Sequence, residues 1–142
     1  MLAYLWPLLL IVVSNIFYNI TVKETPGNVS PFLSLVVTYL AGAVISFCIY
    51  LATAEKHQIL QNLKQLNWTS YVLGIAIVGL EAGYIYLYRA GWQISLGSLA
   101  ANITLAVSLI LVGALLYKET IHVNQGIGIM LCLAGLVFIN IK

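Results

Sequence analysis

Charged residues are scarce in this chain. Only 7% of its 142 residues are charged, four acids and six bases, whereas 62% are hydrophobic. A soluble domain carries roughly a quarter charged residues and cannot bury so much apolar surface. The composition therefore excludes a soluble globular domain and predicts an integral membrane protein.

Signatures of several function classes are also missing. Cys48 and Cys132 both fall inside apolar runs, which is typical of packing residues rather than of a disulfide or a metal pair. His57 and His122 lie in connecting segments without partner ligands, so we expect no metal site. The sequence contains no nucleotide-binding loop and no nucleophile–base pair, which argues against ATP-driven transport by this chain and against an enzyme. We expect no cofactor and no nucleic-acid partner.

Long apolar runs dominate what is present. A bilayer core of about 30 Å needs about 20 apolar residues at a rise of about 1.5 Å per residue. The runs long enough to span it cover residues 2–21, 32–54, 70–89, 96–117 and 123–141. No Lys or Arg precedes the first run and no small-residue cleavage site follows it, so we expect a span rather than a signal peptide. The fold class is therefore all-α, with five transmembrane helices in one domain of residues 1–142, because lipid cannot satisfy open backbone groups.

The connection of residues 55–68 differs from the other loops. Its apolar residues recur at helical spacing, opposite a polar face of lysines and a glutamine. They are Ile59, Leu60, Leu63 and Leu66, facing away from Lys56, Gln61 and Lys64. This pattern favours an amphipathic helix on the membrane surface, and the alternative is an ordinary loop.

Basic residues in the loops are evenly divided between the two sides of the membrane. The side that holds the N-terminus collects Lys56, Lys64 and Lys118, and the opposite side collects Lys23, Arg89 and Lys142. Positive loop residues normally select the cytoplasmic side, so an even count is typical of chains that insert in both orientations. The alternative is that six charges are too few to decide the orientation.

The C-terminal half carries a family resemblance. The stretch GSLAANITLAVSLILVGALLYKETIHVNQGIGIMLCLAGLVFIN resembles the end of a drug/metabolite transporter repeat, with the aliphatic–acid motif GALLYKE, a Gln in the loop and a Gly-rich final helix. More loosely, the whole chain is similar to one EamA-type repeat. The final helix is also similar to that of the small multidrug resistance family, whose Gly-x6-Gly pattern matches Gly128 and Gly135. The resemblance implies helix packing or dimerisation at these two glycines.

The resemblance also implies an assembly. Most EamA-type relatives carry two repeats related by a two-fold axis in the membrane plane. This chain then corresponds to one inverted-repeat unit of a ten-helix fold, which an oppositely inserted second copy completes as an antiparallel homodimer. A heterodimer with a different chain is the alternative. We expect a multi-pass protein of the plasma (inner) membrane of a bacterium or archaeon, surrounded by membrane lipid.

Glu81 is the main candidate for function. It stands in the apolar stretch LGIAIVGLEAGYIYLYRAGW, with no charge nearer than Arg89. A buried acid costs about 2.5–3.5 kcal/mol at the bilayer centre, so it should face protein or a wet cavity. Arg89 lies about 12 Å along the helix, too far for a pair unless the helix bends or Arg89 belongs to another protomer. Glu81 is thus expected to bind a proton or a cation, and the alternative is a structural hydrogen bond or an inter-subunit pair.

The residues around Glu81 divide between two helix faces. Tyr84 and Tyr88 share the face of Glu81 and are predicted to bind substrate by hydrogen bonds or cation–π contact. Gly79 and Gly83 form a GxxxG pair on the opposite face, which favours close packing of another helix.

Polar residues in the first and fourth spans are weaker candidates. Most of them, such as Tyr18 and Asn19, are expected to hold helices together. Asn15 and Asn102 lie deepest and are predicted to line the cavity. The first span has no acid in VVSNIFYN, where the small multidrug resistance family has its essential Glu, so that mechanism does not transfer. Glu119 matches a family position but ends a helix, and we expect it to be structural.

The combined prediction is a secondary active transporter. It moves a small organic cation or polar metabolite by alternating access, coupled to protons through Glu81. The alternatives are a flippase or accessory subunit for a lipid-linked head group, and a non-transporting membrane scaffold.

Overall fold

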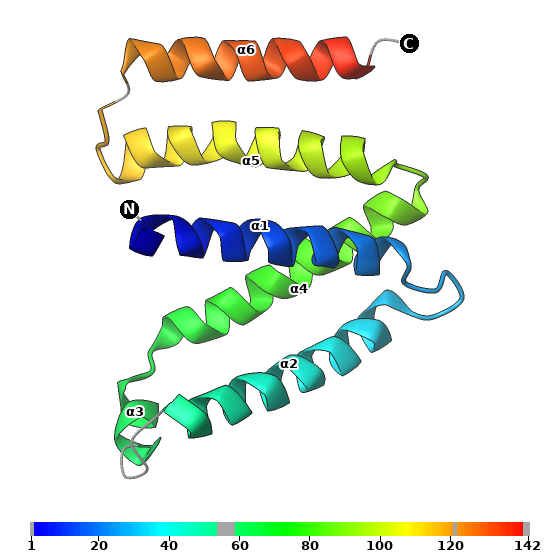
Figure 1. Ribbon diagram of the computed structural model, residues 1–142, viewed down its shortest axis with the longest axis vertical. Helices are drawn as coiled ribbons and strands as arrows, with labels where there is room; N and C mark the ends of the chain where they lie inside the picture. Colours follow the sequence, from blue (N-terminus) through cyan, green and yellow to red (C-terminus); the bar gives the residue numbers. More distant parts are fainter. Residues whose placement is uncertain (1, 54–58, 121, 141–142) are drawn as a thin grey trace. The chain divides into compact units, whose positions relative to one another are not determined.

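The computed structural model describes residues 2–53, 59–120 and 122–140. These ranges are mainly helical and contain no strand (Figure 1). The helices are α1 (Leu2–Lys23), α2 (Pro31–Thr53), α3 (Ile59–Gln65), α4 (Trp68–Arg89), α5 (Ile94–Leu116) and α6 (Val123–Asn140).

Four of the helices are long and apolar enough to cross a membrane, namely α1, α2, α4 and α5. They correspond to the first four predicted spans. The fifth predicted span corresponds to α6, whose described apolar segment, Val123–Gly135, is shorter. That segment rises only about 20 Å, less than a bilayer core, so its crossing of the membrane stays a prediction.

The connection between α2 and α4 contains the short helix α3. This helix lies within the amphipathic segment 55–68 but is shorter than that segment, and residues 54–58 are outside the described ranges. The Asn62 side chain of α3 donates a hydrogen bond of 3.1 Å to the Tyr50 hydroxyl of α2. The location of α3 on the membrane surface stays a prediction.

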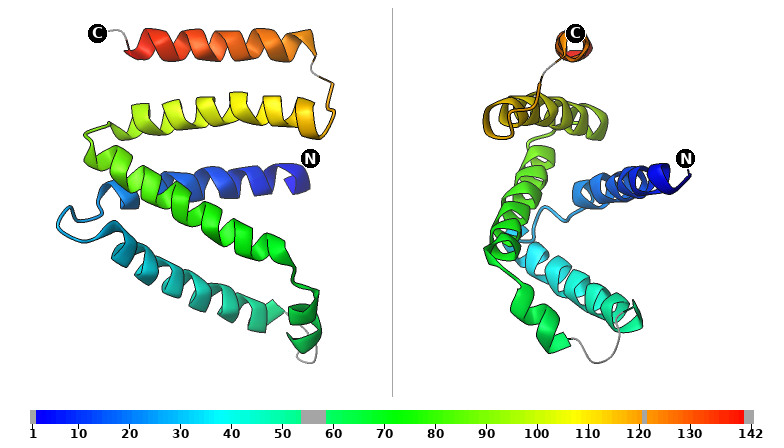
Figure 2. Two further views of the ribbon diagram at one scale, coloured as in Figure 1. Left: turned by 180° about the vertical axis from the view of Figure 1, so that it is seen from behind. Right: turned by 90° about the vertical axis from the view of Figure 1, so that its left-hand side faces the viewer.

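The chain divides into two compact units. In the first unit, Met1–Ala90, α4 packs against both α1 and α2, which diverge from it (Figure 2). In the second unit, Gly91–Lys142, α5 and α6 pack as a hairpin. The buried apolar core of the first unit is small and consists of Leu35, Ala82 and Ile85, with Val22 and Tyr39 against it.

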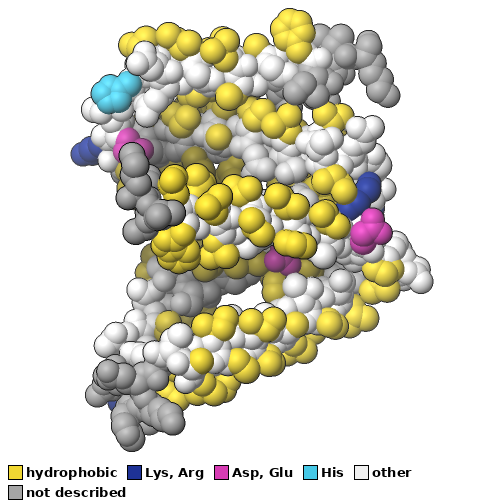
Figure 3. Space-filling model, in the orientation of Figure 1, with side chains coloured by type: hydrophobic (Ala, Val, Ile, Leu, Met, Phe, Trp, Pro, Cys, Tyr) yellow, Lys and Arg dark blue, Asp and Glu magenta, His cyan; other side chains and the backbone are white. Residues whose placement is uncertain are grey.

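Large hydrophobic side chains cover the outer faces of the helices (Figure 3). Even in the middle of α2, Val37 and Leu40 are each 63% exposed. A protein in water does not expose apolar surface of this extent, whereas lipid tails or another membrane chain cover it without cost.

Local sequence explains where several helices begin and end. Pro31 starts α2 at the position where a missing N–H costs nothing. The Asn67 side chain caps α4 by accepting a hydrogen bond of 3.0 Å from the Thr69 amide. Gly91, with φ of +96°, follows the end of α4 in the left-handed region that glycine adopts readily. The Gln125 side chain reaches back to the His122 amide at 3.0 Å, which is half of a capping box for α6.

The motif GALLYKE forms the turn after α5. The Gly113 carbonyl accepts hydrogen bonds from the amides of both Tyr117 and Glu119, each 3.1 Å long. Lys118 between them has a left-handed φ of +53°. The Glu119 carboxylate folds onto Gly113, where a Cβ atom would lie only 2.6 Å from Oε2. The motif thus brings its glycine and its acid into contact at the end of a helix, which supports a structural role for Glu119.

The glycines predicted to pack helices have open surroundings within their own units. Gly79 and Gly83 lie on the exposed side of α4, and apart from the nearby backbone of α4 and the adjacent residues no described atom of the first unit comes within 4 Å of an added Cβ. The same holds for Gly128 and Gly135 within the second unit. Their close packing against another chain stays a prediction.

Candidate functional site

Glu81 lies on the face of α4 that packs against α1 and α2. Ile85 and Tyr88 follow it at helical spacing on this face, and both are buried, as is the adjacent Ala82. Glu81 itself is half-buried. The packing of α4 therefore directs the acid into the interior of the first unit.

A cavity of about 170 Å³ lies between α1, α2 and α4 and is lined by Glu81. Most of its other lining residues carry hydroxyl groups. The lining consists of Tyr18, Thr21, Val22, Thr25, Ser34, Leu35, Thr38, Glu81 and Ile85. Thr25 follows the end of α1 and Ser34 lies in the first turn of α2, so the hydroxyl-rich part of the cavity is nearest the α1–α2 loop.

Three hydroxyls of the lining have their hydrogens directed at their own helices. Thr21 donates to the Phe17 carbonyl at 2.9 Å, and Thr38 donates to the Ser34 carbonyl at 3.1 Å. Thr25 donates to the Thr21 carbonyl at 3.2 Å. A hydroxyl that donates in this way keeps its oxygen lone pairs as acceptors. The cavity wall is therefore rich in hydrogen-bond acceptors.

Two tyrosine hydroxyls are buried beside the acid. Tyr39 of α2 lies next to the Glu81 carboxyl group, but the pair does not reach the geometry of a formed hydrogen bond. Tyr18 of α1 lies close enough to interact electrostatically with the same carboxyl group. Neither hydroxyl has a hydrogen-bond partner among the described residues.

The tyrosines also form an aromatic row across the α1–α4 contact. The rings of Tyr18 and Tyr84 meet edge to face, with centroids 5.6 Å apart and an interplanar angle of 86°. The Tyr84 and Tyr88 rings are 5.9 Å apart and tilted by 39°. Tyr84 is half-buried and thus lies between the cavity residue Tyr18 and the buried Tyr88.

Tyr88 is engaged in helix packing. It is 4% exposed, and its hydroxyl donates a hydrogen bond to Oδ1 of Asn19, which is 5% exposed. The Lys23 ammonium lies 5.5 Å from the centroid of its ring and donates to its carbonyl at 3.4 Å. Tyr88 is not among the residues that line the cavity, and its predicted role in substrate binding stays a prediction.

The two predicted asparagines are not among the residues that line this cavity. Asn15 is exposed and accepts a hydrogen bond of 2.8 Å at its carbonyl from the Asn19 side chain, one turn further along α1. Asn102 belongs to the second unit, where its side chain donates to the carbonyl of Ser98 at 2.8 Å and to its hydroxyl at 3.2 Å. Both asparagines therefore bond within their own helices.

Arg89 has partners other than Glu81 in its own chain. Its guanidinium donates to the carbonyls of Pro26 and Val29, at 2.9 and 2.7 Å, and so fastens the α1–α2 loop to the end of α4. Within the described part of the chain, no ion pair involves Glu81. The helix does not bend to join the two residues, so an arginine beside the acid would have to come from another chain.

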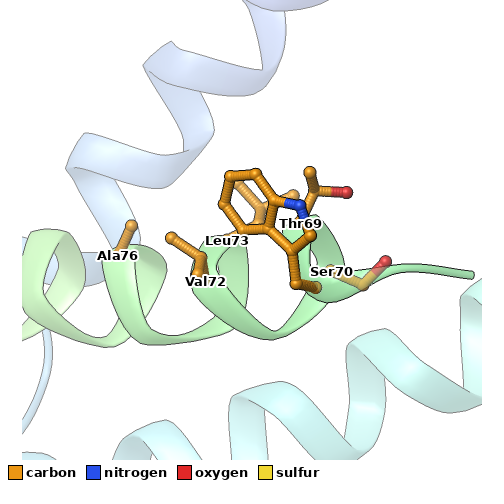
Figure 4. A pocket seen from close by; sticks show the side chains of 6 residues that line it. Thr69, Ser70, Val72, Leu73 and Ala76 are labelled. Carbon is orange, nitrogen blue, oxygen red and sulfur yellow. The ribbon is translucent and has the colours of Figure 1, made fainter.

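Other candidate sites are weaker. The described residues contain no cluster of three possible metal ligands. A hollow of about 430 Å³ lies at the start of α4 and is lined by Trp68, Thr69, Ser70, Val72, Leu73 and Ala76. Figure 4 shows these side chains along the helix. All its lining residues belong to one helix, so it is an apolar groove along α4 rather than a site between elements.

Sequence reasoning missed Tyr39, Ser34 and Thr38, and it assigned Tyr18 to helix packing. A signal was present in α2, because Ser34 and Thr38 are one turn apart in an otherwise apolar helix and Tyr39 follows directly. The pattern marks a polar face on α2, but it does not say which neighbouring helix that face meets.

The long apolar helices and the acid between three of them define a multi-pass integral membrane protein with a polar site inside its helical domain. The model of the EamA-like transporter family matches residues 1–141, and the chain belongs to that family. It is therefore a membrane transporter of the drug/metabolite class, which confirms the resemblance found in the sequence. Comparison with curated proteins and with solved structures gave no match.

Proposed function

We propose that the protein is a secondary active transporter that moves a small organic cation or polar metabolite by alternating access, coupled to protons through Glu81. The observation that carries this proposal is an acid that has no ion pair among the described residues and lies in a hydroxyl-lined cavity between α1, α2 and α4. A transporter needs a polar site within its membrane domain, and this cavity offers a carboxyl group among hydroxyl groups inside the first unit.

The electrostatics around Glu81 explain how coupling would work. A carboxylate removed from water loses solvation, and a bound proton or cation offsets that loss by neutralising the charge. Among the described residues, the titratable groups that interact with Glu81 are Tyr18 from α1 and Tyr39 from α2. Neither of these can become positive, so a proton and a cationic substrate compete for one carboxylate. Such competition is the thermodynamic basis of exchange.

Alternating access also requires an exit on the opposite side of the membrane. The hydroxyl-rich part of the cavity faces the α1–α2 loop, which supports an entrance from that side. A second copy inserted in the opposite orientation places its own entrance on the other side. The antiparallel homodimer then has two equivalent end states, so the transition between them needs little free energy.

Proton release on cation binding tests the central role of Glu81. Purified full-length protein in weakly buffered detergent solution is titrated with two probes, protonated ethanolamine and choline. Release approaching about one proton per bound cation is expected from the wild type, by linkage, and none from Glu81→Gln. Glu119→Gln is the matched control, because it neutralises an acid outside the cavity, and it should release protons like the wild type.

Two outcomes would overturn the proposal. One is equal proton release from wild type and Glu81→Gln. The other is no proton release from either probe. Thermal unfolding in the same detergent shows whether each variant is folded, and Glu81→Asp, which keeps the carboxylate, provides a second variant that should retain release. Uptake into proteoliposomes with and without a pH gradient then separates a carrier from a scaffold that only binds.

Orientation is tested by labelling a single cysteine from each side of the membrane. Lys64→Cys on α3, in a chain with Cys48 and Cys132 replaced by serine, places a thiol in an exposed position. Roughly half of the molecules should react from each side if insertion is evenly dual. Labelling from one side alone excludes the antiparallel homodimer and leaves a heteromeric assembly.

A further inference from the structure

The site around Glu81 presents an unusual excess of hydrogen-bond acceptors. An ionised carboxylate only accepts, and the hydroxyls of Thr21, Thr25 and Thr38 already donate to their own helices. The hydroxyls of Tyr18 and Tyr39 are buried beside the acid without a partner among the described residues. Each of these phenols can also accept. A ligand that satisfies this set must bring several donors and a positive charge.

Aromatic rings offer less to a cation here than their number suggests. A cation without N–H groups binds best against several open ring faces. The Lys23 ammonium already lies over the Tyr88 ring at 5.5 Å from its centroid. The Tyr18 and Tyr84 rings are packed edge to face against each other, at 86°. An open cage of ring faces is therefore not formed by these three tyrosines.

We infer that the Glu81 site takes a small primary ammonium group and discriminates against its N-methylated forms. The inference rests on the proposed function, in which Glu81 binds a cation, and it adds the chemical class of that cation. One N–H group bonds the carboxylate, and the others bond hydroxyl oxygens of the cavity lining, namely those of Tyr18, Thr21 and Thr38. Tyr39 lies beside the carboxylate and positions it. Each N-methyl group removes one donor and leaves one acceptor of the site unbonded.

The size of the cavity is consistent with such a group. About 170 Å³ accommodates an ammonium head with a stem of a few carbon atoms and not an extended polycyclic drug. Val22, Leu35 and Ile85 supply an apolar part of the wall against which a short carbon stem packs. Substrate recognition is thus assigned to residues of the first unit.

A matched ligand series tests the inference. Protonated ethanolamine, N-methylethanolamine, N,N-dimethylethanolamine and choline have the same charge and three, two, one and zero N–H groups. Size is controlled by 2-amino-2-methylpropan-1-ol, an isomer of N,N-dimethylethanolamine that keeps a primary ammonium group. Affinities come from the proton-release titration or from calorimetry on the detergent-solubilised full chain at neutral pH.

Affinity should fall along the series, by about tenfold or more between ethanolamine and choline, because charged hydrogen bonds are lost. The primary isomer should bind more tightly than N,N-dimethylethanolamine by a similar factor. Tyr18→Phe, which removes an acceptor of the cavity lining, should bring the ratio for the isomer pair closer to one while the affinity for choline changes little, and Tyr39→Phe in addition should reduce the ratio further. Tyr71→Phe is the control, since Tyr71 is 76% exposed near the start of α4, and it should leave the ratio unchanged.

The inference is overturned if choline binds as tightly as ethanolamine. It is also overturned if the ratio of the affinities for the two isomers is unchanged by both tyrosine substitutions. If the double variant does not fold, the affinities of the wild type still show whether primary ammonium groups are preferred. Each single variant then shows whether that preference depends on its tyrosine. Glu81-dependent proton release with no preference along the series leaves the proposed function standing and removes only the substrate class. Loss of Glu81 dependence removes both.

Discussion

The two units of the chain differ in where their polar residues make contact. In the first unit, polar side chains bond between helices, as in the Tyr88–Asn19 hydrogen bond and the cavity around Glu81. In the second unit, the hydrogen bonds of Asn102 and Gln125 remain within a helix or at its end. The family resemblance was nevertheless strongest in the second unit. The residues that carried the resemblance most clearly are therefore not the residues that form the candidate site, although the family model matches residues 1–141.

The structure gives a physical reason for this separation. The most recognisable motif, GALLYKE, is a turn in which Glu119 folds onto Gly113. Gln125, in the loop that follows, caps α6. Helix ends of this kind depend on particular residues in a particular order, so they leave a strong sequence pattern. A cavity built from three helices depends on isolated residues far apart in the chain, and it leaves a weak one.

The largest effect on stability is expected from the polar contact between α1 and α4. Asn19→Ala removes the acceptor of the Tyr88 hydroxyl in a buried position, so the free energy of unfolding should fall by about 2 kcal/mol. Asn102→Ala removes only bonds within α5 at an exposed position, and its effect should stay below about 0.5 kcal/mol. Thermal or denaturant unfolding in detergent measures both. Equal losses would remove the contrast between the two units.

A smaller effect is expected where Arg89 fastens the α1–α2 loop. Arg89→Ala removes two hydrogen bonds from a cation to carbonyls at an exposed site, and the free energy of unfolding should fall by about 1–1.5 kcal/mol. Hydrogen exchange of the Val29 amide, which bonds to the Pro26 carbonyl within the same loop, should become faster. Lys64→Ala, which removes a cation on α3, is the control and should leave that amide unchanged. An unaltered exchange rate in Arg89→Ala means that the loop is held by other contacts.

The smallest effect on stability is expected at Gly113, where the helix propensity of alanine and its contact with Glu119 oppose each other. Alanine is a better helix former than glycine by about 1 kcal/mol, but its Cβ would lie 2.6 Å from the Glu119 carboxylate. Gly113→Ala should therefore be nearly neutral in the wild type and stabilising by about 1 kcal/mol in Glu119→Ala. A double-mutant cycle of unfolding free energies measures this coupling. Simple additivity of the two substitutions contradicts the contact between them.

The helices themselves were largely predictable from the sequence, because long apolar runs bounded by loop residues leave few alternatives in a membrane. The first four spans correspond to α1, α2, α4 and α5, with ends that differ by a few residues. Pro31 and Asn67 explain why two of these helices start where they do. The amphipathic pattern after α2 located α3, although the helix is shorter than the pattern.

The site was predictable only in part. Glu81 stood out because a charge in an apolar run is costly wherever the helix lies. Its aromatic neighbours did not stand out equally, because the period of one helix shows which residues share a face and not which helix meets that face. Tyr84 lies next to Tyr18 of the cavity, whereas Tyr88 bonds Asn19 and contacts the Lys23 ammonium with its ring. Tyr39 comes from α2, and its place beside Glu81 follows from tertiary packing alone.

The distribution of thiols has a practical consequence for spectroscopy. Cys48 on α2 and Cys132 on α6 are both free and exposed, one in each unit, and neither lines the cavity. Spin labels or fluorophores attached to these two native cysteines allow the distance between the units to be measured without any engineered cysteine. Distance distributions recorded at acidic and alkaline pH, with and without an amine, would then report directly on how the two halves of the chain rearrange during a turnover.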